Sequence, residues 1–547
     1  MSAARRVVAA GAALLAIAGA GAIRPVAAQV AGVDVLRYRF AIDLPRRGSE
    51  IAVRATLTVA RERAVRELPL DLLAPMRVAD AEVGCVRPRR VLAEHDGRVV
   101  RIPLPAARAA RDTVCVTLRY AGAPRDGLII STDSAGRWQA FGDNWPDRAR
   151  HWLATVDHPS DKAPVEFVVD APAGRRVVAN GTERGLASLL GGRQRTTWAI
   201  DEPIPTYLMV IAAAPLVEHP LGATACGAGE GGSCVLQSVF TAPEQASAMP
   251  GRFAAAGDVV QYFARTVGPF PYPQLQHLQS STRFGGMENA GAIFYADRLF
   301  RTPDGVSVGL IAHETAHQWF GDAVTERAWG HLWLSEGFAT YFAALYTAHA
   351  VGDSAFQADR EAIRDAVRQS AVTAARPVLD TAQAELVQLL NTNSYQKGGF
   401  VLHMLRQEVG DRAFFAAVRA YHAAHRHGTA MTDDLRAAME REAGRDLRWF
   451  FDQWLTRPGL VEGQVTWRHD AEAQALVVTV VQDGRFPPYR FPLTVGVTLP
   501  DGTRRLVTVP VPAAREATIV ADLHLSQAPR AVEVDPRADL LHALRVP

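Results

Sequence analysis

The chain has 547 residues, of which 48% are apolar and 21% charged, so it is long enough for several folded domains and too apolar to be disordered. Its 59 basic residues nearly balance its 57 acidic ones, and three arginines within residues 1–28 account for the small excess. This balance gives no reason to expect nucleic acid or a membrane surface as a partner.

Residues 1–28 have the pattern of a signal peptide. The basic pair Arg5 and Arg6 precedes an apolar run over residues 7–23, and residues 26–28 (VAA) fit a signal-peptidase site. We expect cleavage after residue 28, export to the periplasm or the medium, and no stable membrane insertion of the mature chain. A buried or membrane-spanning helix is the alternative, although the run is short and Arg24 interrupts it. The export route stays open, because adjacent arginines also occur in twin-arginine signals.

The chain contains four cysteines, which are Cys85, Cys115, Cys226 and Cys234. An even number in an exported chain favours two local disulfides, Cys85–Cys115 and Cys226–Cys234. Free buried thiols are the alternative. None of the four lies near the histidine motif described below, so a zinc–thiolate site is not expected.

Residues 29–218 follow the predicted signal and are mostly strands. In residues 50–60 (EIAVRATLTVA), for example, Ile51, Val53, Leu57 and Val59 point to one side of a strand and polar residues to the other. This alternation predicts an N-terminal β-sheet domain.

Residues 219–458 form the predicted catalytic domain, in which helical periodicity dominates from about residue 250, most clearly in residues 401–425 and 433–455. Alternation returns in residues 459–547, where one face of a strand carries Leu493, Val495, Val497 and Leu499 before a turn at residues 500–503. We therefore predict an α+β multidomain protein that ends in a C-terminal β-sandwich.

The motif HETAH at residues 313–317 indicates a metal site. Positions i and i+4 share one face of a helix, so His313 and His317 can bind one ion while Glu314 projects beside it. A catalytic zinc needs a third protein ligand and one open position for water. Glu336, in a second helical segment nineteen residues after His317, is the candidate. One Zn²⁺ per chain is expected.

Four segments together resemble the zinc aminopeptidases of peptidase family M1, the gluzincins of the alanyl aminopeptidase and leukotriene hydrolase type. They are HETAHQWFGDAVTERAWGHLWLSEGFATYF (313–342), FGGMENAGAIFY (284–295), SYQKGGFVLHML (394–405) and ARHWLATVDHPSDKAPVEFVVDAPAG (149–174). The resemblance implies a thermolysin-like, mainly helical catalytic domain. It also implies that His313, His317 and Glu336 bind zinc, that Glu314 is the general base, and that Tyr395 donates to the oxyanion.

The stretch Gly285, Gly286, Met287, Glu288 and Asn289 resembles the exopeptidase signature of that family. The resemblance implies that Glu288 pairs with the free α-ammonium of the substrate and that the glycine backbone lies along the peptide. A buried carboxylate without its ammonium is costly, so a substrate with a blocked N-terminus should be rejected.

The sequence also departs from the family. Most members have a glutamine or glutamate from the β domain as a second contact to the amine, whereas the corresponding stretch here contains Asp143, which could substitute. Gln396 and Ser335 stand where glutamate and asparagine are common. The large C-terminal helical domain of many members is missing, which would leave the site more open.

Lysine usage adds a separate observation, because Lys162 and Lys397 are the only lysines among 59 basic residues and both lie in matched segments. We hypothesise that each position needs a compact ammonium to pair with a buried carboxylate or to fix the loop of Tyr395. Chance is the alternative.

The predicted function is therefore an exported zinc aminopeptidase that removes the N-terminal residue from peptides with a free N-terminus, without an obligate protein partner. Two alternatives remain. One is the epoxide hydrolysis of the leukotriene hydrolase branch, and the other is peptide binding without catalysis.

Overall fold

The computed structural model describes residues 32–547 apart from residues 108, 226–233 and 303–304. The predicted signal and Cys226 lie outside the described residues. The chain divides into two compact units. The first extends to Trp329 and adds Ala384–Val387 and Arg419–Met431, and the second holds Gly330–Gln383, Gln388–Val418 and Thr432–Pro547. None of the described helices is both long and apolar enough to cross a bilayer.

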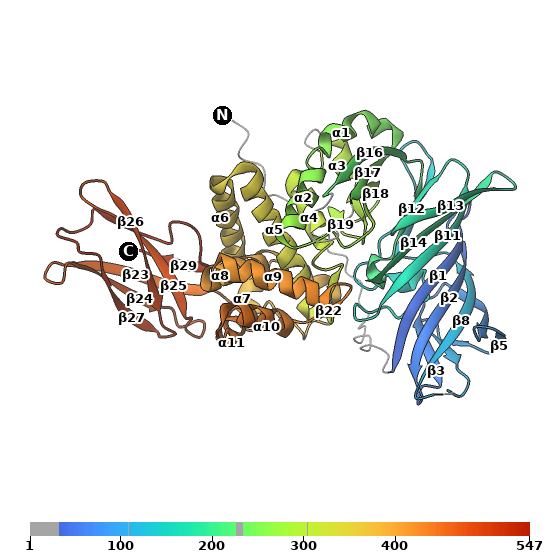
Figure 1. The fold of residues 1–547 in the computed structure, drawn as a ribbon, viewed down its shortest axis with the longest axis horizontal. Coiled ribbons are helices and arrows are strands. Elements are labelled where there is room, and N and C mark those ends of the chain that lie inside the picture. Colours follow the sequence, from blue (N-terminus) through green and yellow to red (C-terminus); the bar gives the residue numbers. More distant parts are fainter. Residues whose placement is uncertain (1–31, 108, 226–233, 303–304) are drawn as a thin grey trace. The chain divides into compact units, whose positions relative to one another are not determined.

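The N-terminal part of the first unit is built on an eight-stranded sheet, shown in blue to teal in Figure 1. Its order is β13 (Thr182–Leu189), β14 (Arg193–Pro205), β11 (Lys162–Pro172), β1 (Val33–Asp43), β2 (Ile51–Glu62), β8 (Arg111–Gly122), β4 (Arg77–Val83) and β5 (Arg89–Val91). All neighbours are antiparallel except β1 and β11. Ile51, Val53, Leu57 and Val59 of β2 are buried, which confirms the predicted alternation.

Two smaller sheets accompany the large one. The first consists of β12 (Arg176–Ala179), β15 (Ile211–Ala214), β10 (Trp138–Gly142) and β9 (Leu128–Thr132), and the second of β3 (Glu67–Asp71), β7 (Val99–Pro103) and β6 (Glu94–His95). The predicted disulfide between Cys85 and Cys115 is present and ties the loop after β4 to β8.

The rest of the first unit contains a five-stranded sheet with helices beside it. The strand order is β16 (Val217–Thr224), β17 (Val235–Thr241), β18 (Gln274–Ser280), β20 (Ala292–Ala296) and β19 (Gly286–Met287). The helices are α1 (Met249–Arg252), α2 (Ala256–Thr266), α3 (Asp297–Arg301) and α4 (Val308–His317), and β21 (Val324–Glu326) pairs with β22 (Gly428–Ala430). Strands β18 and β20 lie in the region where helices were expected, and the sequence did not predict them. Both strands are buried on both faces, so their residues show no alternation.

The second unit contains most of the predicted helices. They are α5 (Trp333–Val351), α6 (Asp353–Gln369), α7 (Ala371–Ala375), the π-helical turn η6 (Asn393–Lys397), α8 (Gly398–Val409), α10 (Thr432–Ala443) and α11 (Arg448–Leu455). Helix α9 (Asp411–His425) crosses from the second unit to the first. The helical patterns predicted at residues 401–425 and 433–455 each correspond to two helices in the structure. Gly410 (φ 83°) and Gly444 (φ 67°) have left-handed conformations that end the first helix of each pair.

Short 3₁₀ turns join the longer elements. They are η1 (Ala149–His151), η2 (Thr206–Leu208), η3 (Pro243–Ala248), η4 (Trp329–His331) and η5 (Leu386–Leu389).

The second unit ends in two sheets that form the predicted C-terminal β-sandwich, drawn in red in Figure 1. One has the order β27 (Glu516–Asp522), β24 (Ala475–Gln482), β23 (Val461–Asp470) and β29 (His542–Arg545), and the other β26 (Arg504–Val511), β25 (Phe491–Thr498) and β28 (Ala531–Val534). Leu493, Val495 and Val497 are buried as predicted, and Leu499 lies just past the end of β25. The α+β multidomain prediction is confirmed, and in the described residues the helices of the second unit are followed by sheets.

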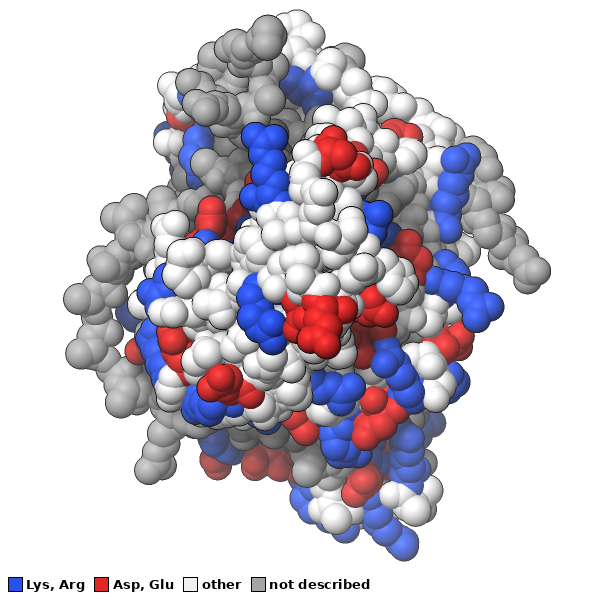
Figure 2. Space-filling model, turned by 90° about the vertical axis from the view of Figure 1, so that its left-hand side faces the viewer, with Lys and Arg blue, Asp and Glu red and all other residues white. Residues whose placement is uncertain are grey.

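Charges of both signs are interspersed on the face of the molecule seen in Figure 2. The C-terminal sheets also carry exposed ion pairs, such as Arg468–Asp470 and Arg504–Glu533. The interspersed charges agree with the near balance of basic and acidic residues in the sequence.

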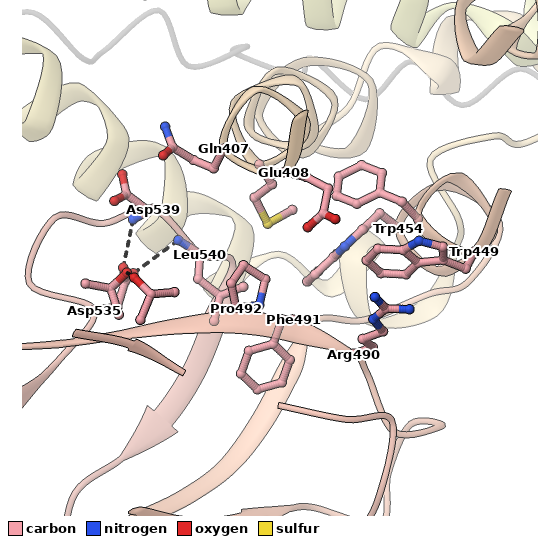
Figure 3. A pocket seen from close by; sticks show the side chains of 14 residues that line it. Gln407, Glu408, Trp449, Trp454, Arg490, Phe491, Pro492, Asp535, Asp539 and Leu540 are labelled. Atoms are coloured by element: carbon pink, nitrogen blue, oxygen red, sulfur yellow. Dashed lines mark hydrogen bonds between the residues drawn. The ribbon is translucent and has the colours of Figure 1, made fainter. Parts of the chain in front are cut away.

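A cavity of about 140 Å³ lies in the second unit, where α8 and α11 meet β25 (Figure 3). Arg490 stacks on Trp449 at its edge, with the guanidinium carbon 4.3 Å from the ring centre. The buried amide of Gln453 in α11 binds both the N–H (2.8 Å) and the carbonyl (2.9 Å) of Arg490. No residue predicted for the active site is among the described residues that line this cavity.

Candidate active site

Helix α4 places the two histidines of the HETAH motif. The Ser307 hydroxyl caps its first turn by accepting a hydrogen bond from the Leu310 N–H (3.2 Å), and Ile311, Ala312 and Ala316 are buried. The predicted i, i+4 geometry is present.

The two imidazoles point to one place, since the Nε2 atoms of His313 and His317 lie 3.2 Å apart. Nδ1 of His317 lies 3.2 Å from the carbonyl oxygen of Phe320. Because a carbonyl only accepts, this contact holds the ring proton on Nδ1 and leaves the Nε2 lone pair for a cation. Two imidazole nitrogens that converge in this way suit a shared metal ion such as zinc.

The glycine-rich signature lies directly against the predicted base. Gly286 and Met287 form β19 and pair with Tyr295 and Phe294 of β20. A Cβ atom on Gly286 would come 2.1 Å from Oε1 of Glu314, so only a glycine lets the strand pass this close to the carboxylate as it stands.

Glu288 and Glu314 lie beside His317. Both carboxylates are buried, with 7% and 4% of the residue exposed, and one oxygen of each lies within 4.8 Å of the other and of a His317 ring nitrogen. Asp322 is the next acidic residue after Glu314. Its burial, and to a smaller extent the nearby charge of Glu288, raise its pKa well above the usual value. Glu288 and Glu314 therefore place two buried carboxyl groups beside His317, an arrangement that suits a cationic group.

Glu336 and Tyr395 lie in the second unit and form a pair of their own. Glu336 is buried in the first turn of α5, and the Tyr395 hydroxyl, carried by η6, donates to its Oε1 at 2.8 Å. The two elements approach closely, because a Cβ on Gly337 would come 2.9 Å from the carbonyl carbon of Gly398. The unit boundary runs between these residues and the histidines, inside the predicted catalytic domain. The boundaries at residues 218 and 458 stay predictions.

Asp143 has protein partners. Its fully buried carboxylate accepts from Nη2 of Arg148 (2.9 Å) and from the backbone N–H of Arg283 (3.3 Å). A carboxylate that is already neutralised by an arginine is a weaker partner for an ammonium. Asp143 was expected to make the second contact to the substrate amine. This stays a prediction, and the ion pair with Arg148 does not favour it.

Lys397 is fully buried and Lys162 is partly buried, and burial lowers the pKa of each to about 7. The Lys162 ammonium donates to the carbonyls of Asp322 (2.8 Å), Ala323 (3.0 Å) and Gly428 (2.9 Å), and so holds the loop after α4. Lys397 donates to the carbonyl of Gly459 at 2.8 Å and holds the end of η6. The hydrogen-bond partners of both lysines are main-chain carbonyls rather than carboxylates, and the Lys397 contact agrees with the other alternative, that this lysine fixes the turn of Tyr395.

Sequence reasoning missed Gln318, whose buried amide contacts the loop that carries Glu288. Its place directly after His317 was visible, but an amide has no titratable or metal-binding group that would mark it.

Comparisons with known proteins agree with these motifs. Residues 254–454 match the Peptidase family M1 domain. The chain carries an M1 peptidase domain. It is 30% identical over 391 residues to aminopeptidase N of Streptomyces lividans, an alignment that covers 66% of this chain and 44% of that protein. The chain spans less than half the length of the first curated relatives that it matches.

Two solved structures resemble the chain. A mutant of the M1 zinc metallopeptidase from Deinococcus radiodurans is 26% identical with a TM-score of 0.68, and the match covers 79% of this chain and 96% of that one. Legionella pneumophila aminopeptidase A, solved with aspartic acid, shares the fold with a TM-score of 0.82 at 17% identity, over 94% of this chain and 60% of that one.

Proposed function

We propose that this M1 protein is an exported zinc aminopeptidase that hydrolyses the N-terminal peptide bond of peptides with a free α-ammonium. The observation that carries the proposal is the convergence of Glu288, Glu314 and His317 within 4.8 Å. A carboxylate for the amine, a carboxylate for proton transfer and a metal-binding imidazole are then adjacent. Hydrolysis of a peptide bond that lies one residue from an ammonium group needs all three groups close together.

The metal would be held by His313, His317 and, as the third ligand, Glu336. The facing Nε2 atoms support this donor set, and so do the burial of Glu336 and its position nineteen residues after His317. A His₂Glu set is a known catalytic zinc site. Zinc bound there would polarise the peptide carbonyl and acidify a water molecule.

The chain's own residues supply the rest of the reaction. A Glu314 carboxylate oxygen accepts a proton from the attacking water and returns it to the departing amine. The Tyr395 hydroxyl donates to the carbonyl oxygen as negative charge develops on it, and exchanges its bond to Glu336 for that role. Glu288 binds the α-ammonium and so selects the terminal bond.

The test combines activity with metal content. A panel of aminoacyl p-nitroanilides should be cleaved by the purified protein, and a chelator should abolish the cleavage. Glu314→Gln should keep the metal by elemental analysis and lose at least about 1000-fold in kcat, since the proton acceptor is removed. Glu442→Gln, an exposed change in α10, is the matched control. Wild-type rates in Glu314→Gln would show that another group is the base.

Export is the second part of the proposal. The Cys85–Cys115 disulfide supports it, because such bonds persist in oxidising compartments. N-terminal sequencing of the protein produced in a bacterial host should find Gln29 as the first residue, in the periplasm or the medium. A cytoplasmic protein that retains residues 1–28 would contradict it.

A further inference from the structure

The loop that carries Glu288 is held by side chains from two other elements. It comprises residues 288–291 and joins β19 to β20, which pair through two residues of β19. So short a ladder is a weak constraint on a loop. The position of the Glu288 carboxylate therefore depends on what binds the loop backbone.

Gln318 binds both ends of this loop. Its Nε2 donates to the carbonyl of Glu288 at 2.8 Å, and its Oε1 accepts from the N–H of Gly291 at 2.8 Å. The side chain is fully buried and follows His317 directly, at the C-terminal end of α4. One amide thus joins the amine-binding loop to the helix that bears the base and the histidines.

A second amide holds the middle of the loop from the N-terminal domain. Nδ2 of Asn180 donates to the carbonyls of Ala290 (2.9 Å) and Leu208 (2.8 Å), while its Oδ1 accepts from the N–H of Val210 (2.7 Å). The carbonyls of Asn289 and Gly291 bind the N–H groups of Ala292 and Gln276. All four loop carbonyls are therefore paired, as buried backbone requires.

The consequence for the site follows from where Gln318 is attached. Glu288 can serve a substrate ammonium only if its carboxylate keeps a fixed offset from Glu314 and His317, and both of these lie on α4. The Gln318 amide transmits the position of α4 to the loop through two short hydrogen bonds. Its loss would leave a buried carbonyl and a buried N–H unpaired, so the loop would have to move to recover them.

We propose that Gln318 is a positioning residue that sets the Glu288 carboxylate against Glu314 and His317, and thereby the preference for a free α-ammonium. This inference rests on the proposed function, because it assumes that Glu288 reads the amine.

The experiment compares ligands that differ only in the amine. Alanine p-nitroanilide and propionyl p-nitroanilide are substrates with and without it, and alanine hydroxamate and propionohydroxamate are the corresponding binding probes for calorimetry. The wild-type protein should prefer the amine in both pairs. In Gln318→Met, kcat/KM for the alanyl substrate should fall about 10- to 100-fold, whereas the affinity for propionohydroxamate should stay within about threefold.

Two further variants separate positioning from folding. Gln453→Met removes an amide that bridges the N–H and carbonyl of one residue in the same way, far along the chain, so it should lower Tm and leave the amine preference unchanged. Gln318→Glu keeps an acceptor for Gly291, and because burial favours the protonated carboxyl, its hydroxyl can still donate to the carbonyl of Glu288. It should fold if Gln318→Met does not, with a smaller loss of preference.

The outcomes distinguish the two proposals. A wild-type protein that neither cleaves the alanyl substrate nor prefers the amine ligand would overturn the proposed function. A wild-type protein with the preference, together with a folded, metal-bearing Gln318 variant that keeps the same amine preference, would overturn the positioning role alone.

Discussion

Replacing Glu288 with glutamine tests the central assumption, that this buried carboxylate reads the substrate amine. The substitution keeps the shape of the side chain and removes its charge. Glu288 is 7% exposed and lies within 4.8 Å of Glu314, so an ammonium bound there sits in a site largely shielded from water.

The magnitude follows from that burial. An ammonium about 4 Å from a carboxylate gains about 4 kcal/mol at an effective dielectric constant of about 20. A glutamine oxygen retains a neutral hydrogen bond worth about 1 kcal/mol, which leaves a loss of about 3 kcal/mol. Since about 1.4 kcal/mol is a factor of ten, kcat/KM for alanine p-nitroanilide should fall about 100-fold.

The assay measures kcat/KM for the alanyl and propionyl p-nitroanilides in the wild type, in Glu288→Gln and in the Glu442→Gln control. The propionyl substrate has no ammonium, so its rate should change little, and an N-acetylated substrate should be a poor substrate for all three proteins. Equal losses on both substrates, or no loss on the alanyl one, would refute the reasoning that Glu288 binds the amine.

Three further predictions concern the metal, the tyrosine turn and pH. His317→Ala should reduce bound zinc from about one per chain to below about 0.1 by elemental analysis, because a two-ligand site holds zinc weakly; retained zinc would contradict the ligand assignment. Lys397→Arg should lower kcat about tenfold without lowering the folded yield, since a forked guanidinium does not fit the carbonyl of Gly459, and an unchanged kcat would contradict it. Burial raises the pKa of Asp161 to about 7, so the stability that it contributes is fully present below about pH 4 and lost as pH rises through 7. Between pH 4 and pH 8, the free energy of unfolding measured in urea should fall in the wild type by about 2–4 kcal/mol more than in Asp161→Asn, which has no carboxyl group to titrate. Identical pH profiles of the two proteins would refute the assignment.

Local patterns in the sequence were sufficient for several features. Alternation along β2 and β25 identified the buried face of each strand, because side chains of a strand alternate whatever the strand packs against. The spacing of His313 and His317 predicted that their side chains converge, because residues four apart lie on the same face of a helix. The Cys85–Cys115 pairing was also expected.

Other features depended on packing that no local pattern records. The helical patterns at 401–425 and 433–455 continued through Gly410 and Gly444, yet each divides there. A glycine within a periodic run is compatible with a continuous helix or with a break, and tertiary contacts decide between them. Strands β18 and β20 were missed because burial on both faces removes alternation.

By itself, the sequence determined which residue types could do the chemistry and which of them share one helical turn, because those relations follow from covalent spacing. Only the tertiary structure decided that Glu288, distant in sequence from α4, lies against Glu314 and His317, and that Arg148 neutralises Asp143. It also decided that Gln318 joins the loop of Glu288 to α4. These relations arise from how separate elements pack and pair their buried polar groups, and that pairing is a property of the whole fold.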